Sequence, residues 1–599
     1  HDAGEDGVLA GLDPDQRAAA EVPGGPLLIV AGPGTGKTRT VTHRIAHLVL
    51  ERDVPARQCL AITFTRRAAE EMTERLHALV GAKARDITVA TFHSLGLAVL
   101  RERHARLELP ADFGVADAAE QHRVLTEVAG DERAARRLRS AISRARRGGA
   151  QDGSGETDTP DADVADTVPR YLAALRERGL VDYDDLLALP VELLESDADA
   201  REEYRRRFQW ITVDEYQDVD DLQYRLLRLL APGEANLTAI GDPDQAIYAF
   251  RGADVRFFLR FQQDYPQAPV VQLTRNYRSG RHILAGALKA IRPGTLVADR
   301  QLHPTRDDSA QRITLHRAAD ERAEAAFVAR TIDRLLGGTS LHSLDSGRVQ
   351  GDGDGRIGFS DIAVLYRTDA QSRALLEELG RCGFPAQKRS HDPLTARSGV
   401  EHILRELTHT SAASAPGETP VVERVRAAAG AILASLPDGR REERAAELRT
   451  AVELLTPLAH RCGTDLARFC QEVLLGAEVD ALDPRADAVS LLTLHAAKGL
   501  EFPVVFVTGC EDTLLPLRWP GTEPDEAALA EERRLCFVGM TRAQDHLYLT
   551  HAAKRTRRGE ARETRPSPFL TEVRELSEAV TTESAPPRPR RRAQQLSLL

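Results

Sequence analysis

Short apolar runs recur along the chain, and longer polar stretches with helical spacing separate them. The first run, residues 26–31 (PLLIVA), ends in a glycine-rich turn, and a helical pattern covers residues 38–50. This order predicts a strand, a loop and a helix. Similar runs occupy residues 59–63, 210–213, 237–240, 362–365 and 504–507. Such alternation predicts an α/β fold, with parallel sheets flanked by helices.

Two stretches rich in alanine, leucine, arginine and glutamate, residues 101–185 and 391–486, interrupt this alternation. Their composition predicts mainly helical insertions. Residues 148–163 are polar, glycine-rich and acidic, which predicts a mobile loop inside the first insertion. Prolines and an arginine run predict that residues 566–599 form a disordered tail.

Composition narrows the class of protein. The 599 residues suffice for about four domains at roughly 150 residues each. No apolar run approaches the ~18 residues of a membrane span, and the six cysteines are scattered without metal-ligand spacing, so we expect a protein of the reducing cytoplasm. The net charge of −11 does not exclude nucleic acid, because one basic channel is sufficient. Because the chain begins with His1, we expect it to be a piece of a longer polypeptide with a further N-terminal domain.

The turn after the first apolar run carries a phosphate-binding pattern, AGPGTGKT. Backbone N–H groups of such a loop cradle phosphates at a helix N-terminus, the Lys37 ammonium reaches the β- and γ-phosphates, and the Thr38 hydroxyl binds Mg²⁺. The alternative is an ordinary glycine-rich turn. The candidate nucleotide-binding residues here are Ala31, Gly32, Pro33, Gly34, Thr35, Gly36, Lys37 and Thr38.

A pair of carboxylates follows the apolar run at residues 210–213. Asp214 and Glu215 begin the sequence DEYQD, at the carboxyl end of an expected parallel strand, where nucleotides bind. Asp214 suits Mg²⁺, and Glu215 suits a general base that activates water. A surface acidic turn that caps a helix is the alternative interpretation. Further along the chain, Arg278 and Arg542 are candidate cations for the γ-phosphate, although each taken singly would be a salt bridge.

An ordered set of motifs resembles the UvrD-like superfamily-1A DNA helicases, the group that includes PcrA and Rep. The set runs from near the N-terminus to about residue 550. It comprises LDPDQ, AGPGTGKTRT, TFTRRAAEEM, TFHSLG, DEYQD, GDPDQAIYAFRGAD, NYRS, TLHAAKGLEF and EERRLCFVGMTRA.

The resemblance assigns roles around the nucleotide. It implies that Gln16 reads the adenine edge, that Arg39 and Tyr277 flank the base, that Gln245 senses the γ-phosphate, and that Glu501 approaches the ribose. It also implies that Arg278 and Arg542 are arginine fingers, which reach from a second motor domain into a site built by the first.

The resemblance likewise implies a path for single-stranded DNA, where stacking on aromatic rings is tolerant of sequence. Phe250 occupies a position where many relatives carry tryptophan. For any one aromatic residue, core packing is the alternative. The implied DNA-binding residues are Phe64, Thr65, Thr91, Phe92, His93, Tyr248, Phe250, Arg251 and His495. A basic cluster in the first insertion could also follow phosphates, and it contains Arg133, Arg136, Arg137, Arg139, Arg144, Arg146 and Arg147.

The family pattern implies two RecA-like motor domains, each with a helical insertion. We expect the first at residues 1–100 and 186–275, with its insertion at 101–185. The second is expected at 276–390 and 487–565, with a reduced insertion at 391–486 that lacks a clear duplex-contact motif. The resemblance therefore supports translocation along DNA more strongly than unwinding of the duplex.

By this resemblance the chain uses ATP and Mg²⁺ to move 3′ to 5′ on single-stranded DNA and at single-strand/duplex junctions. Its setting would be repair or replication at a bacterial nucleoid, with no membrane and with a repair partner. The last five residues, Gln595, Leu596, Ser597, Leu598 and Leu599, are similar to the peptide that binds the bacterial sliding clamp. A leucine-rich disordered end is the alternative.

Three other functions remain open at this point. The chain could strip proteins from DNA or act as a scaffold with weak unwinding, or it could be the motor subunit of a helicase–nuclease. It could also be an ATPase that acts on proteins or small molecules, in which case DNA would not stimulate hydrolysis.

Overall fold

The computed structural model describes residues 7–146, 162–306, 313–337, 357–390, 392–411, 419–436, 441–483, 486–518, 525–557, 559–576 and 580–584. Internal contacts divide the chain into two compact units. The first comprises His1–Arg278, Thr295–Thr305 and Arg389–Pro484, and the second comprises Ser279–Gly294, Arg306–Lys388 and Arg485–Leu599. Within the described residues, no helix is both long and apolar enough to cross a bilayer.

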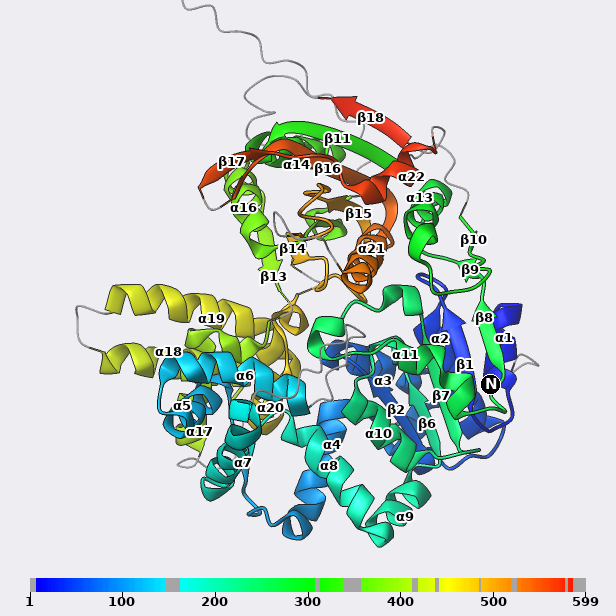
Figure 1. Ribbon diagram of the computed structural model, residues 1–599, viewed down its shortest axis with the longest axis vertical. Coiled ribbons are helices and arrows are strands. Elements are labelled where there is room, and N and C mark those ends of the chain that lie inside the picture. The colour runs from blue at the N-terminus through cyan, green and yellow to red at the C-terminus, as the bar shows by residue number, and fades with distance from the viewer. Residues whose placement is uncertain are drawn as a thin grey trace, which may run out of the picture. The chain divides into compact units, whose positions relative to one another are not determined.

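The first unit is built on a parallel six-stranded sheet in the order β3-β2-β6-β7-β1-β8 (Figure 1). The predicted strands at 26–31, 59–63, 210–213 and 237–240 are confirmed. The remaining two, β3 and β8, are too short and too mixed in polarity to stand out in the sequence. The strands are β1 (Leu27–Ala31), β2 (Cys59–Thr63), β3 (Thr88–Thr91), β6 (Trp210–Val213), β7 (Asn236–Gly241) and β8 (Val270–Leu273).

Helices cover both faces of this sheet, because successive side chains of a buried strand point to opposite sides. In β2, Cys59 and Ala61 pack on one side, whereas Leu60 and Ile62 pack on the other. The first face carries α1 (Pro14–Glu21), α2 (Lys37–Leu50) and α3 (Arg66–Val80). The second carries α4 (Phe92–Arg103), α8 (Asp185–Ser196), α9 (Ala198–Arg207), α10 (Asp221–Leu230), α11 (Arg256–Leu259) and α12 (Phe261–Asp264).

The first helical stretch has its own small core. Helices α5 (Ala118–Ala129), α6 (Glu132–Arg146) and α7 (Ala162–Glu177) pack through Val124, Leu138 and Leu175. A two-stranded ribbon, β4 (Gly114–Val115) with β5 (Leu180–Val181), joins its two ends. The loop expected at 148–163 lies outside the described residues up to residue 161, and α7 begins at Ala162.

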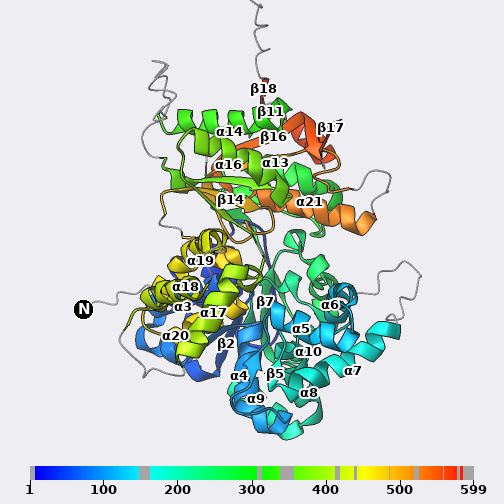
Figure 2. The ribbon, with the colours of Figure 1, turned by 90° about the vertical axis from the view of Figure 1, so that its left-hand side faces the viewer.

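The second helical stretch forms a separate bundle with its own apolar core (Figure 2). It comprises α17 (Ser398–Ser411), α18 (Val421–Ser435), α19 (Arg441–Cys462) and α20 (Leu466–Leu475). In sequence it is inserted between strands of the second sheet, but its contacts group it with the first unit. Glu70 on α3 is 3.2 Å from the guanidinium of Arg468 and 3.5 Å from that of Arg461, and Arg66 is 3.6 Å from Glu472.

The second unit contains a larger sheet in the order β13-β14-β12-β15-β16-β11-β18, to which β17 adds antiparallel beside β16. The predicted strands at 362–365 and 504–507 are confirmed. The strands are β11 (Ile313–Asp320), β12 (Ile362–Tyr366), β13 (Ala386–Arg389), β14 (Val489–Thr493), β15 (Phe502–Val507), β16 (Ala543–Arg557), β17 (Glu560–Glu563) and β18 (Val580–Ser584). Its helices include α13 (Arg281–Ile291), α14 (Glu321–Leu335), α16 (Ser372–Arg381) and α21 (Glu526–Met540). Both units thus have the RecA-like arrangement of parallel strands between helices.

One boundary needs correction. Residues from 566 onward were expected to be disordered, yet a turn at Pro568–Leu570 and helix α22 (Thr571–Arg574) bury Phe569 and Val573. Strand β18 then pairs with β11. The apolar residues Phe569, Leu570 and Val573 supply enough burial to order this segment, despite its charged surroundings. Residues 585–599, including the expected clamp-binding peptide, lie outside the described part of the chain.

Candidate functional site

The loop between β1 and α2 has the geometry of a phosphate cradle. Gly34 and Gly36 adopt positive φ angles of 67° and 81°, which only glycine adopts at little cost. The Thr35 hydroxyl donates a 2.7 Å hydrogen bond to the Gly32 carbonyl and closes the loop. Lys37 is the first residue of α2, so its side chain and the free backbone N–H groups lie at the same helix N-terminus.

Three residues that follow β8 hold this loop from the other side. The Asn276 side chain, which is fully buried, donates a 2.6 Å hydrogen bond to the Pro33 carbonyl, and the Tyr277 N–H donates to the Gly34 carbonyl at 2.8 Å. A methyl group at Gly34 would lie 2.6 Å from Cβ of Arg278. Glycine is therefore required for close approach as well as for its φ angle.

This packing corrects one expectation. Arg278 was expected in the second motor domain, but its contacts group it with the first unit. It packs against the phosphate loop at Gly34. The chain crosses to the second unit at Ser279, one residue later than Arg278. This segment of the first unit therefore ends inside the motif NYRS, three residues after residue 275, where the first domain was expected to end.

The acidic pair lies at the carboxyl edge of the same sheet, directly after β6. Asp214 is buried, and its carboxylate accepts a 2.9 Å hydrogen bond from the Glu215 N–H. Glu215 adopts φ = 52°, a left-handed conformation that is rare outside glycine and costs on the order of 1–3 kcal/mol. Its Oε1 is 3.0 Å from Nζ of Lys37. The strained turn thus aims a carboxylate at the phosphate-loop lysine.

A chain of hydrogen bonds joins this pair to the loop after β7. The Gln217 amide donates to Oε2 of Glu215 at 2.5 Å and accepts from the Asp242 N–H at 3.1 Å. Gln245, which is buried, donates to Oδ2 of Asp242 at 2.9 Å. The expected general base and the expected γ-phosphate sensor therefore belong to one connected network.

The residues expected around the adenine also lie within the first unit. Gln16, on α1, donates to the Thr35 carbonyl at 2.9 Å and accepts from the Asp13 N–H at 3.2 Å, so both ends of its amide are already used by backbone groups. Arg39 is exposed and donates to the Gly11 carbonyl at 2.7 Å. Tyr277 is 45% exposed, and its hydroxyl donates to Asp13 at 2.7 Å. An open ring face and an amide thus stand beside the phosphate loop.

Helix α1 itself is fixed by a buried arginine. Arg44 of α2 donates to the carbonyls of Ala20 at 3.1 Å and Val22 at 2.7 Å, at the end of α1. Burial lowers the pKa of Arg44 to about 10. A cation at this position complements the negative end of the α1 dipole and sets the distance between the two helices.

The expected DNA-binding residues divide into exposed and buried ones. Phe64 follows β2 and packs edge-on against Phe92 with ring centroids 5.4 Å apart. Phe92 is only 1% exposed, so it supports Phe64 from the core and offers no face to a base, which corrects that assignment. Thr65 and Thr91 cap α3 and α4, since their hydroxyls accept from the N–H groups of Ala68 and Ser94. His93 stacks on Tyr183 at 3.9 Å.

The most accessible aromatic residue of the site follows the Gln245 turn. Phe250 is 60% exposed and lies 6.2 Å from the Tyr248 ring. The Arg251 guanidinium is 5.8 Å from the Tyr248 ring centroid and 5.5 Å from that of Phe250. Burial raises the pKa of Tyr248. An exposed ring with a cation beside it suits base stacking next to a phosphate.

The remaining residues of the prediction lie in the second unit. Arg542 is buried, and it donates to the carbonyls of Val538 at 2.9 Å and Leu500 at 3.2 Å. Glu501 is exposed and accepts from Gln544 at 3.2 Å. His495 follows β14 and is half-buried. Their roles at the nucleotide and the DNA stay predictions.

The basic cluster of the first insertion is only partly a surface feature. Arg146 is held by Asp182 at 2.8 Å and by Asp185, and its side chain is 10% exposed, so it anchors α6 to the start of α8. Arg133, Arg136, Arg137 and Arg139 are exposed on α6. The side chains of Arg144 and Arg147 lie outside the described residues.

Comparison with known proteins places the chain in a family. The model of the UvrD/REP helicase N-terminal domain matches residues 12–266, and that of the UvrD-like helicase C-terminal domain matches residues 271–415 and 421–554. The chain belongs to the UvrD/REP helicase family. Two relatives are the ATP-dependent DNA helicases PcrA of Bacillus subtilis (strain 168), 32% identical over 94% of this chain and 86% of its own length, and UvrD1 of Mycobacterium tuberculosis (strain CDC 1551 / Oshkosh), 34% identical over 95% and 86%.

Three residues of this UvrD/REP-family site were not singled out from the sequence. Asn276 and Asp242 stand inside motifs that the sequence does display, NYRS and GDPDQ, but their backbone and carboxylate contacts appear only in the fold. Arg300 contacts both Asp242 and Asp244, and it stands in no motif. Sequence position alone gives no signal for it.

Proposed function

We propose that the chain hydrolyses ATP and uses the energy to move 3′ to 5′ along single-stranded DNA, opening duplexes ahead of it. The observation that carries this proposal is the ion pair between Lys37 and Glu215 at the carboxyl edge of the first sheet. It joins a phosphate cradle to a general base within one rigid unit. The names of the relatives, ATP-dependent DNA helicases, support the same activity.

The residues of the first unit divide the chemistry among themselves. The N–H groups of the phosphate loop and the Lys37 ammonium hold the phosphates and stabilise charge on the γ-phosphoryl group. Glu215 takes a proton from the attacking water, and Gln245 donates toward the transferred group. Tyr277 stacks on the base while Gln16 turns its amide toward the adenine edge. Arg278, and Arg542 of the second unit, neutralise charge that develops during transfer.

The donor set also fits Mg²⁺. The Thr38 hydroxyl and the Asp214 carboxylate are hard oxygen ligands, and Asp214 is 6% exposed after a buried strand. When bound, Mg²⁺ would supply neutralisation of the charge on the phosphates. Thr38 and Asp214 would hold it.

DNA is proposed to lie across the loops that follow β2, β3 and β7. Phe64, Phe250 and the cation of Arg251 supply stacking and a phosphate contact, with Thr65, Thr91, His93 and Tyr248 of the same unit. His495 is proposed as the DNA contact of the second unit. Stacking does not depend on base identity, so we propose binding to single strands and to single-strand/duplex junctions without sequence preference. We propose a role in repair or replication at the nucleoid, where such DNA substrates arise.

The test compares ATP hydrolysis with and without single-stranded DNA for the unaltered chain, Lys37→Ala and the exposed control Lys83→Ala. We expect DNA to stimulate hydrolysis, Lys37→Ala to abolish it and Lys83→Ala to leave it unchanged. Strand displacement is then measured on 3′- and 5′-tailed duplexes, and only 3′-tailed ones should open. Hydrolysis that ignores DNA would refute the motor assignment. DNA-stimulated hydrolysis without displacement would instead favour a protein-stripping translocase or the motor subunit of a larger repair assembly.

A second element of the proposal concerns the chain end. Residues Gln595, Leu596, Ser597, Leu598 and Leu599 are proposed to bind the hydrophobic groove of a bacterial sliding clamp. Purified clamp should bind the full chain, and Leu598→Ala with Leu599→Ala should remove that binding while ATP hydrolysis is retained. Equal binding by both proteins would refute this contact.

A further inference from the structure

A short segment, Thr295–Thr305, brings a buried arginine into the site of the first unit. Residues on both sides of this segment belong to the second unit, so the chain enters the first unit at Thr295 and leaves it after Thr305. We call Thr295–Thr305 the strap. Its backbone pairs with the loop after β8, since the His303 N–H donates to Thr274 at 2.7 Å and the Thr305 N–H donates to Asn276 at 3.0 Å.

Two carboxylates of the Gln245 turn fasten the strap. Arg300, whose side chain is 7% exposed, forms an ion pair with Asp242 and another with Asp244 at 2.9 Å, and both aspartates are fully buried. Asp244 also accepts from the Leu296 N–H and the Thr295 hydroxyl, each at 2.6 Å. These strap contacts thus all end on one turn of the chain, the one that carries Asp242 and Asp244.

Arg300 is one contact away from the groups proposed to act on the phosphate. The Asp242 carboxylate binds Arg300 through Oδ1 and receives the Gln245 amide on Oδ2. The Asp242 N–H donates to Gln217, which in turn binds Glu215. On its other side Arg300 lies against the phosphate loop, because a methyl group at Gly32 would be 3.0 Å from its Nη1. A shift of this guanidinium would therefore reach both the sensor and the base.

The charge states of Asp242, Asp244 and Arg300 depend on one another. Burial and the neighbouring Asp242 raise the pKa of Asp244, and Arg300 opposes that rise. The charged groups in contact are Asp242, Asp244 and Arg300, and the neutral ones are Thr295, Gln217 and Gln245. Without the guanidinium, two buried carboxylates would face each other, and one would take up a proton or turn away.

We infer that Arg300 is a positioning residue for hydrolysis, which holds Asp242 so that Gln245 and, through Gln217, Glu215 keep their geometry at the γ-phosphate. The inference rests on the proposed ATP hydrolysis. It adds a residue outside the motifs, and it makes the strap part of the hydrolytic site.

The test uses Arg300→Met, which keeps the length of the side chain without its charge, and Arg300→Lys, which keeps the charge without the two-sided contact. Arg106→Met, which removes an exposed arginine–aspartate pair in the same unit, is the matched control. For Arg300→Met we expect kcat of DNA-stimulated hydrolysis to fall roughly 10- to 100-fold, since a misplacement of about 1 Å has effects of that size. KM for ATP and the affinity for a fluorescent ADP analogue should change less than about threefold, because the substitution removes no group that is proposed to contact the nucleotide. The kcat of Arg300→Lys should lie between that of the unaltered chain and that of Arg300→Met.

A second readout does not need hydrolysis. In nucleotide-free Arg300→Met, loss of the guanidinium should raise the pKa of Asp244 further, so the folded chain should keep a proton that the unfolded chain has released. Its Tm, relative to Arg106→Met, should therefore fall as the pH rises from 5 to 8. The unaltered chain should show a weaker slope, because Arg300 opposes the rise in the pKa of Asp244.

The outcomes separate the two proposals. If the unaltered chain hydrolyses no ATP with DNA, the proposed function fails, whereas the Tm slope still reports on Arg300. If Arg300→Met binds the ADP analogue normally and keeps kcat within about twofold of Arg106→Met, the positioning role is wrong. If Arg300→Met does not fold, Asp244→Asn with Arg300→Met removes the charge imbalance and should fold with the same low kcat. Normal kcat in that double variant, or its failure to fold, would reduce Arg300 to a purely structural residue and overturn the inference.

Discussion

Nζ of Lys37 lies 3.0 Å from Oε1 of Glu215, so the phosphate-loop lysine and the proposed general base form an ion pair. Both side chains are largely buried, at 14% and 21% exposure. In the proposed mechanism, a γ-phosphate bound by Lys37 would compete with Glu215 for the ammonium, so nucleotide binding and the proposed base would share one cation.

Replacing Glu215 by glutamine separates binding from hydrolysis. We expect Glu215→Gln to lower kcat by about 10²- to 10⁴-fold, the usual contribution of a general base, while the affinity for a fluorescent ADP analogue is retained. Glu234→Gln, an exposed change in the same unit, should leave both unchanged. Stopped-flow binding and steady-state hydrolysis measure the two quantities. A loss of nucleotide binding in Glu215→Gln would contradict the assigned role.

Phe250 offers the clearest test of DNA stacking, because its ring is 60% exposed beside Arg251. Phe250→Ala should weaken binding of single-stranded DNA by about 1–3 kcal/mol, equally for oligo-dT and for a mixed sequence. Fluorescence anisotropy measures the affinity. Leu259→Ala, another exposed apolar residue of the first unit, is the control and should bind normally. Unchanged affinity in Phe250→Ala would place the DNA elsewhere.

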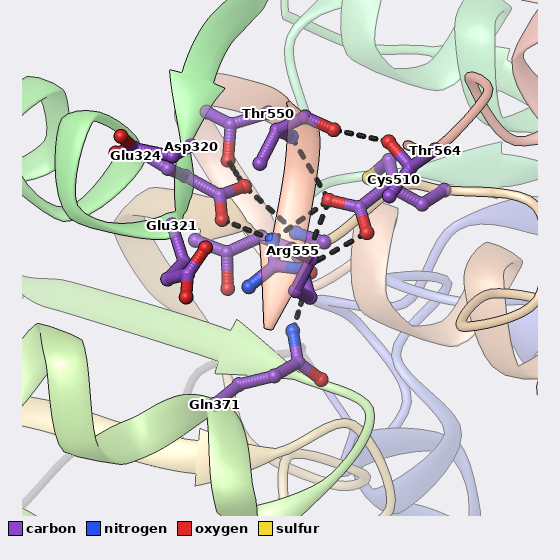
Figure 3. A network of polar contacts seen from close by, with 12 residues as sticks. Asp320, Glu321, Glu324, Gln371, Cys510, Thr550, Arg555 and Thr564 are labelled. Atoms are coloured by element: carbon purple, nitrogen blue, oxygen red, sulfur yellow. Dashed lines mark hydrogen bonds and ion pairs between the residues drawn. The ribbon is translucent and has the colours of Figure 1, made fainter. Parts of the chain in front are cut away.

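A buried ion network holds the second unit together (Figure 3). Arg555 on β16 contacts Glu324 of α14 and lies 2.7 Å from Glu511, which follows β15. Glu324 also accepts from the Thr550 hydroxyl at 2.6 Å and from the Gly509 N–H at 2.9 Å. Although burial opposes ionisation, Arg555 and these donors hold the pKa of Glu324 below its ordinary value.

Removing the central cation should therefore destabilise this unit. Arg555→Met leaves two buried carboxylates without their counter-ion and should lower the free energy of unfolding by about 3–5 kcal/mol. Arg562→Met removes a surface pair with Glu560 and should change it by less than about 1 kcal/mol. Calorimetric melting of the full chain measures both. Adding Glu324→Gln and Glu511→Gln to Arg555→Met should restore part of the loss, and a failure to do so would argue against an electrostatic cause.

His551, on β16, makes the stability of the same unit dependent on pH. Burial, with Arg574 and Arg317 nearby, lowers its pKa to about 4. Between pH 4 and 6.5 the unfolded histidine is protonated and the folded one is not, so its contribution to stability is full above pH 6.5 and is lost as the pH falls toward 4. Tm should drop between pH 7.5 and 5, and His551→Gln should reduce that drop. His77→Gln, an exposed control, should keep the full drop. An equal drop in both variants would assign it to other groups.

The mostly apolar strands and the chemistry that follows them can be predicted from the sequence alone. Residues 59–63 and 210–213 each contain one threonine among apolar residues, because parallel strands are buried on both faces, and this pattern can be recognised without knowing the neighbouring strands. The sequence also predicts the phosphate loop and the pair Asp214 and Glu215. Each follows its strand directly along the chain, so the neighbouring elements are known from the local order. Local order also identified Phe250 beside Arg251.

The contacts between segments that are far apart in sequence could be seen only in the three-dimensional fold. Strand β16 alternates polar and charged residues with apolar ones, because Thr550 and Arg555 satisfy buried partners on α14 and after β15, and no local pattern reveals those partners. Phe92 and Phe250 are equally aromatic in sequence, but Phe92 is buried against Phe64, whereas Phe250 is exposed. Arg300 joins Asp242 across 58 residues, a separation at which periodicity carries no information. The chemistry is encoded in short motifs, whereas its geometry depends on long-range packing, which a single sequence does not display.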